Sequence, residues 1–356
     1  MNINTLPRKS ISLVKKLVNQ RQKLAQPTFV KKALQKPLRV AVIGTGKAAK
    51  YHLHVLSNID GVDIACIVNR GRSDPHPLME QYSITESYTN INQAIDNWKI
   101  DAAIVAVTPG STFEVSKALI DNNINCLIEK PLGVNIQEAN ALKLLASQKE
   151  CILAVGYNRR FYSSVLAAYD YTQAVGRPYS IHIEAPEDIV KQLRNKITED
   201  VKNRLISSTT HAIDLFTLFA GEHEDVSCIE YAKYYDGIQA DFMSFIRFQN
   251  IGTGSFISHW RSPGDWTVSL YGDNYKLIID LFKNKLLRYQ GKNKELVDTS
   301  NGFDVLFKPG VYLQNYNFLT CIINQKQPEP VLASINDAFQ SLKLANDIIT
   351  TSWDRP

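Results

Sequence analysis

Short, unbroken runs of hydrophobic residues recur through the first part of the chain and alternate with stretches of helical periodicity. The first run, residues 38–43 (LRVAVI), has the composition of a strand buried on both faces of a sheet, and Gly44 follows it directly. Further runs occupy residues 62–68, 102–107, 125–128 and 152–155, and helical patterns occupy residues 47–59, 91–98, 113–122 and 137–148. This alternation predicts a doubly wound parallel sheet.

Beyond Gly156 the alternation ends, and most strand-like runs follow one another as in an antiparallel meander. These runs are residues 179–184, 241–248, 253–259, 267–271, 277–280 and 285–289, and helical patterns occur at residues 209–220, 316–323 and 334–350. We therefore predict an α/β protein with two domains. Residues 38–156 form an N-terminal Rossmann domain, and residues 157–356 form a C-terminal α+β domain with a large, mostly antiparallel open sheet.

Length and composition agree with this division. A chain of 356 residues exceeds the size that one hydrophobic core usually serves. No stretch approaches the roughly 18 consecutive apolar residues of a membrane span. The five cysteines have neither metal-like nor disulfide-like spacing. We therefore expect reduced thiols and a cytoplasmic protein.

The basic residues are concentrated at the N-terminus. Residues 1–37 hold nine Lys or Arg and no acid, so the remainder carries a formal charge of −4 out of the overall +5. The segment has an amphipathic helical pattern that Pro27 ends. A transit peptide, a helix that contacts a membrane surface and a solubilising arm all remain open for this basic extension. A nucleic-acid partner is not expected, because aromatic residues are not interleaved with the basic ones.

A glycine-rich turn lies between the first strand and the first helix. It consists of Gly44, Thr45, Gly46, Lys47, Ala48 and Ala49, which is a G-x-G-x-x-A pattern. In such a turn the first glycine permits the tight bend, the second lets the backbone approach a pyrophosphate, and the alanine allows close packing of helix on strand. This position in the chain indicates dinucleotide binding.

The end of the second strand predicts which dinucleotide binds. Asn69 and Arg70 stand where an acidic residue would accept hydrogen bonds from the adenosine ribose. Hydrogen-bond donors and positive charge suit a 2′-phosphate, so NADP is favoured over NAD.

Further motifs follow in order along the chain. They are Thr108-Pro109 after the third strand, Glu129-Lys130-Pro131 after the fourth, residues 156–161 (GYNRRF), His211-x-x-Asp214, and the stretch from Trp260-Arg261 to Gly272. With the glycine turn, these motifs identify a resemblance to the Gfo/Idh/MocA family (glucose–fructose oxidoreductase / inositol dehydrogenase). The resemblance extends from Leu38 to the C-terminus.

The resemblance implies roles for particular residues. Thr108, Pro109, Glu129, Lys130 and Pro131 would lie at the cofactor, and in that family the Lys–Pro bond is often cis. Lys130 would stabilise charge on the reacting oxygen, and His211 would move the hydroxyl proton.

The substrate side is expected to include residues of the second domain. These are Tyr157, Asn158, Arg159, Arg160, His211, Asp214 and Trp260. The two arginines would suit a phosphate, a carboxylate or a nucleotide-activated sugar, although one of them could instead tie the domains together. Trp260 and Trp266 suit either stacking on a sugar ring or a place in the core or in a dimer sheet. No histidine cluster indicates a metal.

One departure from the family pattern concerns the segment before His211. Many dehydrogenases of the family have an Asp four residues before this histidine, and here Ser207 stands there. This change, with the charged stretch 187–202, indicates a reshaped substrate loop.

These observations predict an NAD(P)-dependent oxidoreductase that acts on a secondary alcohol or ketone of a sugar or nucleotide-linked sugar. Polysaccharide or secondary-metabolite synthesis would be its setting. The alternative is a non-catalytic dinucleotide-binding regulator of the same fold. The resemblance also implies a homo-oligomer that pairs through the open sheet.

Overall fold

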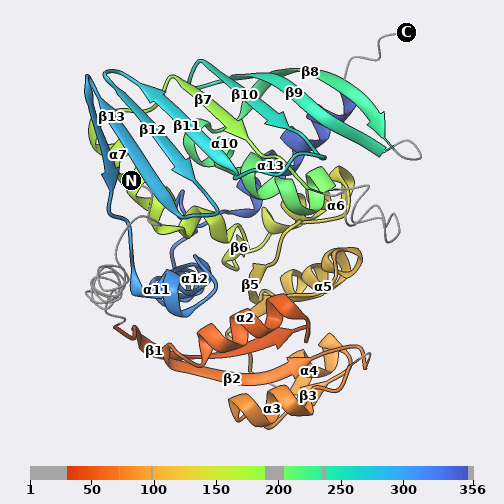
Figure 1. The fold of residues 1–356 in the computed structure, drawn as a ribbon. Coiled ribbons are helices and arrows are strands. Elements are labelled where there is room, and N and C mark those ends of the chain that lie inside the picture. The colour runs from red at the N-terminus through yellow and green to blue at the C-terminus, as the bar shows by residue number, and fades with distance from the viewer. Residues whose placement is uncertain (1–29, 72, 98, 189–203, 235–237, 352–356) are drawn as a thin grey trace, which may run out of the picture.

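The N-terminal half of the chain forms a six-stranded parallel sheet with the strand order β3-β2-β1-β4-β5-β6. The structure is a computed structural model that describes residues 30–351, apart from residues 72, 98, 189–203 and 235–237 (Figure 1). The strands are β1 (Ala33–Ile43), β2 (Asp60–Val68), β3 (Ser87–Tyr88), β4 (Ala102–Val105), β5 (Asn125–Ile128) and β6 (Leu153–Val155). Their order is that of a dinucleotide-binding Rossmann sheet, which confirms the predicted architecture.

Helices connect these strands and cover both faces of the sheet. They are α2 (Lys47–Leu56), α3 (His76–Tyr82), α4 (Ile91–Asn97), α5 (Pro109–Asp121) and α6 (Ile136–Ala146). Successive residues of β1 point to opposite faces of the sheet, and from Val40 on the residues on both faces are hydrophobic and buried. Val40 and Val42 belong to one hydrophobic core, and Ala41 and Ile43 belong to another, on the opposite face.

The second domain contains an eight-stranded sheet with the order β14-β13-β12-β11-β7-β10-β9-β8. Its strands are β7 (Ser180–Glu184), β8 (His223–Tyr234), β9 (Ile238–Phe248), β10 (Thr253–Ser258), β11 (Thr267–Gly272), β12 (Tyr275–Asp280), β13 (Lys285–Gln290) and β14 (Asn293–Val297). Only β7 and β10 pair in parallel, so the predicted mostly antiparallel sheet is confirmed.

One face of this second sheet is covered and the other is open. The helical segments of the domain are η2 (Asn158–Phe161), α7 (Ser163–Val175), η3 (Leu205–Thr209), α10 (Thr210–Ala220), α11 (Gly302–Leu306), α12 (Val311–Asn324) and α13 (Ile335–Thr350). Helices α7, α10 and α13 pack against its inner face (Figure 1). In the described part of the chain, no helix lies on the outer face, which is uppermost in Figure 1.

The last helices return to the Rossmann domain. Phe318 and Leu319 of α12 share a core with Leu53 and Leu56 of α2, and α13 packs against α6. Residues beyond the predicted boundary at 156 therefore complete both faces of the first sheet.

Strand β1 begins before the predicted domain boundary. Its first residue, Ala33, pairs with Asp60. Lys31 forms an ion pair with Asp60 (2.5 Å), and the Lys32 backbone N–H donates to the Tyr312 hydroxyl (3.0 Å). The predicted basic extension is thus too long at its C-terminal end, because residues 31–33 bond to the fold and Ala33 already begins β1.

Most of the extension cannot be compared with its prediction, because residues 1–29 lie outside the described residues. Within the described ranges, no helix combines the length and the apolar character that crossing a membrane requires.

Candidate functional site

The turn between β1 and α2 has the shape that a bound pyrophosphate requires. Gly44 has φ +116°, and a Cβ there would lie 2.1 Å from the Ala106 carbonyl oxygen, so only glycine fits. Gly46 begins α2 and has no other atom within 4 Å of the place a Cβ would take. No side chain caps the helix, so its first N–H groups remain for a ligand.

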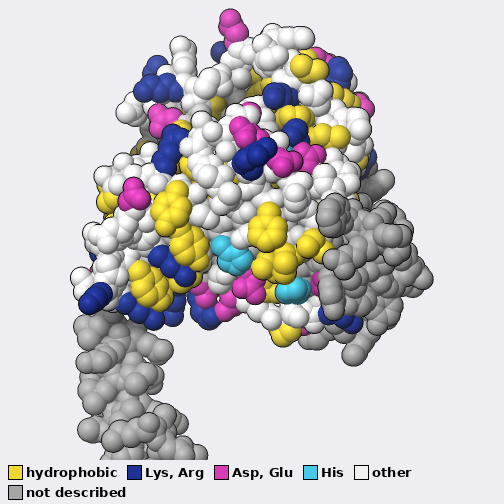
Figure 2. Space-filling view, turned by 90° about the horizontal axis from the view of Figure 1, so that it is seen from above, with side chains coloured by type: hydrophobic (Ala, Val, Ile, Leu, Met, Phe, Trp, Pro, Cys, Tyr) yellow, Lys and Arg dark blue, Asp and Glu magenta, His cyan; other side chains and the backbone are white. Residues whose placement is uncertain are grey.

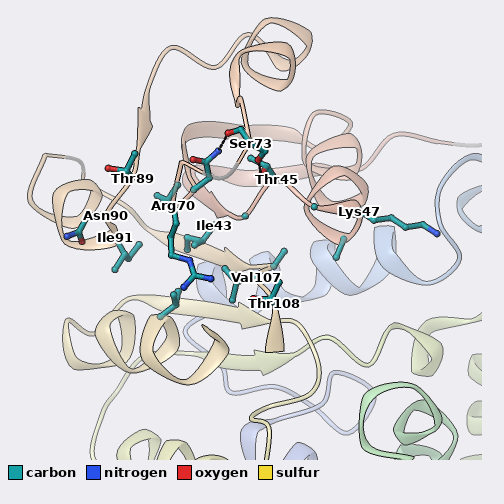
Figure 3. A pocket seen from close by; sticks show the side chains of 17 residues that line it. Ile43, Thr45, Lys47, Arg70, Ser73, Thr89, Asn90, Ile91, Val107 and Thr108 are labelled. Carbon is teal, nitrogen blue, oxygen red and sulfur yellow. Dashed lines mark hydrogen bonds between the residues drawn. The ribbon is translucent and has the colours of Figure 1, made fainter. Parts of the chain in front are cut away.

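A pocket of about 600 Å³ opens beside this turn, at the carboxyl ends of β1, β2 and β4 (Figure 3). Its lining comprises Ile43, Gly44, Thr45, Gly46, Lys47, Ala48, Val68, Asn69, Arg70, Ser73, Thr89, Asn90, Ile91, Ala106, Val107, Thr108 and Val115. The site lies where the strand order of the sheet reverses, which is where dinucleotides bind in such folds. Of the predicted cofactor residues in this region, Ala49 lies in the first turn of α2 and is fully buried, and Pro109 begins α5.

Asn69 and Arg70 use their side chains differently. The Asn69 side chain accepts from the Gly71 N–H (2.9 Å) and donates to the Ser73 carbonyl (2.8 Å), so it holds its own loop. The Arg70 side chain instead extends toward Val107 (Figure 3). The pocket's described lining contains no acidic residue.

The Glu129-Lys130-Pro131 segment follows β5, and the Lys130–Pro131 peptide bond is cis. The Glu129 carboxylate accepts a hydrogen bond from His52 Nε2 (2.9 Å), and His52 Nδ1 lies 3.0 Å from Asn315 Nδ2. Helices α2 and α12 therefore fix this segment from one side. Sequence analysis missed both partners, because His52 carries no motif signal and Asn315 is distant in sequence.

Lys130 and His211 come from different domains and lie close together. Lys130 Nζ donates to the Ser207 carbonyl (2.5 Å) in η3, and His211 follows in the first turn of α10. The His211 ring meets the Tyr157 ring edge-on at 5.8 Å. Its Nδ1 is buried without a hydrogen-bond partner among the described residues.

The electrostatic surroundings of His211 disfavour its charged form. Burial lowers the pKa of His211 well below its ordinary value of 6.5, and the charges of Lys130, Arg159 and Lys308 lower it further. The histidine is therefore neutral at pH 7 and able to accept a proton.

The turn η2 carries the predicted arginines, and the two have separate surroundings. The Arg159 guanidinium lies 4.0 Å from the centre of the Trp266 ring. Arg160 forms two hydrogen bonds of 2.7 Å with Asp214, and both side chains are 1% exposed. Arg160 also donates to the Pro330 carbonyl (2.7 Å). The structure thus places Arg160 and Asp214 in an internal ion pair rather than at the cleft.

Trp260 lies in the core of the second domain. It is 1% exposed, its ring is 5.8 Å from that of Phe242, and its Nε1 donates to Ser258 Oγ (3.1 Å). Because its N–H already has an internal acceptor, the structure does not place it on a sugar-binding surface.

The other predicted substrate residues, Tyr157 and Asn158, form hydrogen bonds that hold the η2 turn in place. The Tyr157 hydroxyl lies 3.1 Å from Thr210 Oγ1, and Asn158 Nδ2 donates to the Pro309 carbonyl (2.8 Å). Lys308 stands just before this proline, and its charge acts on His211. Sequence analysis missed Lys308, because it belongs to no motif. No group of three or more potential metal ligands occurs among the described residues.

Comparison with known proteins agrees with the fold. Residues 38–157 match the family described as "Oxidoreductase family, NAD-binding Rossmann fold". The chain is 23% identical to 4-carboxy-2-hydroxymuconate-6-semialdehyde dehydrogenase from Sphingobium sp., over 86% of this chain and 96% of that protein.

Solved structures show the same fold at low identity. UDP-N-acetylglucosamine 3-dehydrogenase from Acidithiobacillus ferrooxidans superposes with a TM-score of 0.74 at 18% identity, covering 89% of this chain and 98% of the other. Levoglucosan dehydrogenase, in its complex with NADH, gives a TM-score of 0.77 at 17% identity, covering 89% and 97%.

The fold and the site thus define an NAD(P)-dependent oxidoreductase with a Rossmann domain. Residues 38–157 match the model of the Gfo/Idh/MocA family, in agreement with the resemblance that the ordered motifs predicted.

Proposed function

We propose that this protein oxidises or reduces a secondary alcohol or ketone of a sugar or nucleotide-linked sugar, with Lys130 and His211 as its catalytic residues. The observation that carries the proposal is that Lys130 bonds to the Ser207 carbonyl, four residues before His211, and acts on His211 by its charge. When bound, the nicotinamide supplies or accepts the hydride. Three relatives support the substrate class by name, since they are a UDP-N-acetylglucosamine, a levoglucosan and a scyllo-inositol dehydrogenase.

Lys130 is the group that would stabilise charge on the reacting oxygen. Its ammonium is held by the Ser207 carbonyl at 2.5 Å, which fixes its direction without neutralising its charge. An oriented cation in a partly dry site stabilises a developing alkoxide strongly.

His211 is the group that would take the hydroxyl proton during oxidation. Its lowered pKa keeps it unprotonated, and its Nδ1 has no partner among the described residues. During reduction the same nitrogen would return the proton, which the low pKa favours.

NADP is the preferred dinucleotide in this proposal. The Arg70 guanidinium reaches the pocket from the end of β2, and no acid of the described lining would repel a 2′-phosphate (Figure 3).

The open sheet is proposed to pair with a second copy of the chain. Ile229, Met243 and Phe245 of β8 and β9 are 43%, 40% and 61% exposed. Figure 2, which looks down on the molecule from this side, shows hydrophobic side chains among charged ones. A Phe245→Lys variant should then sediment as a monomer, and a monomeric wild type would contradict this pairing.

We propose that the enzyme is cytoplasmic. Its basic N-terminal segment would attach it peripherally to an anionic membrane. Each Lys or Arg near such a surface contributes about 1 kcal/mol. Removal of residues 1–29 should abolish salt-sensitive binding to phosphatidylserine vesicles. Vesicle binding that survives the deletion would exclude the proposal.

The reaction itself is tested by nicotinamide absorbance in single turnovers with free and nucleotide-linked sugars. The proposal expects hydride transfer with at least one class of sugar. A wild type that binds the dinucleotide tightly and transfers no hydride to or from any of them would point to a non-catalytic regulator.

A further inference from the structure

Three cationic side chains from separate segments act on His211 by their charge. Lys130, Arg159 and Lys308 each lower its pKa by charge repulsion, and Arg159 and Lys47 act on Lys308 in the same way. Coulombic effects of this kind require that the groups lie near one another. Lys130 follows β5, Arg159 lies in η2, and Lys308 precedes α12, so folding collects these charges from distant parts of the chain.

The Arg159 guanidinium is held in place but incompletely bonded. It lies 4.0 Å from the centre of the Trp266 ring and 5.5 Å from that of Phe282. Its Nη1 is buried and has no acceptor among the described residues. An unsatisfied buried donor is unfavourable, and an oxygen of a bound anion would give it a partner.

The segment that contains Lys308 packs closely against η2, the turn that carries Arg159. Asn158 Nδ2 donates to the Pro309 carbonyl (2.8 Å), and a Cβ on Gly310 would lie 2.0 Å from the Asn158 carbonyl oxygen. This close contact holds the segment that carries Lys308 against the turn that carries Arg159. The Lys308 side chain itself is exposed, and no ion pair within the described ranges includes it.

Two acidic groups of the neighbouring segments already have other partners. Glu187, which acts on Arg159, accepts from Arg204 Nη2 (2.9 Å) and from the Thr209 hydroxyl (2.9 Å). Asp304 accepts from three donors, among them the Gly310 N–H (2.9 Å). Since the charge of Glu187 is already paired with Arg204, Glu187 does not neutralise Arg159, and the cluster keeps a surplus of positive charge.

Lys47 belongs to the dinucleotide side of the cleft. It lines the dinucleotide pocket, where the N-terminus of α2 already offers N–H groups to a pyrophosphate. Arg159 and Lys308 both lie on elements of the second domain, which leaves them for the substrate.

We propose that Arg159 and Lys308 form an anion subsite for a carboxylate or phosphate of the substrate, which is then an acidic sugar rather than a neutral polyol. The substrate class rests on the proposed function, whereas the subsite rests on the cations themselves. An anion between these residues offsets the charges that act on His211. Binding the correct substrate would therefore raise the pKa of His211 and strengthen it as a proton acceptor.

Binding is measured first, without any need for turnover. Glucose, galactose and N-acetylglucosamine, and for each a uronate and a 6-phosphate form, are titrated calorimetrically into the dinucleotide-loaded protein. At least one acidic form should bind about tenfold or more tightly than its neutral parent, which is a typical effect of one charge-assisted pair. The uronate and phosphate arms identify which anion the subsite takes.

Variants then locate the effect. Lys308→Gln and Arg159→Lys should each reduce the preference for the acid about tenfold. The matched control Lys99→Gln, an exposed lysine in the loop before β4, should leave the preference unchanged. Lys308→Gln should also move the acidic limb of the pH–rate profile to higher pH, because one repelling charge near His211 is gone.

Three results would overturn the subsite. The first is equal binding of the acidic and neutral forms of every sugar. The second is a preference for the acidic form that survives Lys308→Gln. The third is a Lys308→Gln variant that loses affinity for the dinucleotide instead of its preference for the acidic sugar. The two proposals can fail separately. Acid binding without hydride transfer would leave the subsite and remove the proposed function, whereas hydride transfer with no acid preference would do the reverse.

Discussion

The wall of the cleft that receives the dinucleotide pyrophosphate is made of backbone groups from one short segment, whereas the side-chain wall combines three cationic groups and one neutral histidine from four segments. Residues 44–49 provide a bend, an open approach and helix N–H groups within six consecutive positions. Lys130, Arg159, His211 and Lys308 become neighbours only when the domains fold together. The first wall depends on local backbone geometry, and the second depends on the packing that brings distant segments together.

The largest effect is expected from breaking the ion pair between Arg160 and Asp214, which joins η2 to α10. Asp214→Ala leaves a buried guanidinium without its charge partner and should lower the free energy of unfolding by about 3–5 kcal/mol. Chemical denaturation measures this loss. The double variant Arg160→Met/Asp214→Leu removes both charges and should recover most of it. If Asp214→Ala instead kept full stability and only raised the KM for a sugar, Asp214 would be a substrate residue.

The backbone wall is tested by two glycines that differ in their surroundings. Gly44→Ala places a Cβ 2.1 Å from the Ala106 oxygen at φ +116°, so it should cost about 2–4 kcal/mol of stability and abolish dinucleotide binding. Gly46→Ala meets no protein atom within 4 Å, so it should unfold like the wild type and still bind the dinucleotide more weakly. Equal thermal stability of the two variants would show that the turn is not constrained as described.

Arg70 also lines the dinucleotide pocket, and the effect of replacing it should be smaller. Arg70→Ala should weaken NADPH binding about tenfold and change NADH binding little, because only the former has a 2′-phosphate. The matched control is Arg247→Ala, which alters an arginine that is 63% exposed in the second domain. A wild type that binds NADH more tightly than NADPH would refute the NADP preference.

The same contrast explains what could be predicted from the sequence. The parallel sheet and the glycine turn were predictable because each depends on local periodicity or spacing. The prediction missed α7 and β14, and it gave no strand for residues 223–234, which form β8. The strand β14 is largely exposed, so it lacks the hydrophobic alternation on which such predictions depend.

At the site, the motifs predicted Lys130 and His211 but not the residues that set their environment. His52, Asn315 and Lys308 act through contacts that span large sequence distances, which no spacing rule describes. Arg160 shows the opposite difficulty. An arginine in a motif suits an anion or an internal carboxylate equally well, and only packing decides between them.

The central claim is that the side-chain wall performs the chemistry and the backbone wall holds the dinucleotide. The most direct test is single-turnover hydride transfer by Lys130→Met and His211→Ala, with dinucleotide affinity measured on the same samples. Each variant should lose about a hundredfold or more in rate and keep its dinucleotide Kd within about twofold. His211→Ala should also remove an ionisation that lies well below pH 6.5 in the wild type. Hydride transfer at the wild-type rate in either variant, or a loss of affinity as large as the loss of rate, would contradict the claim.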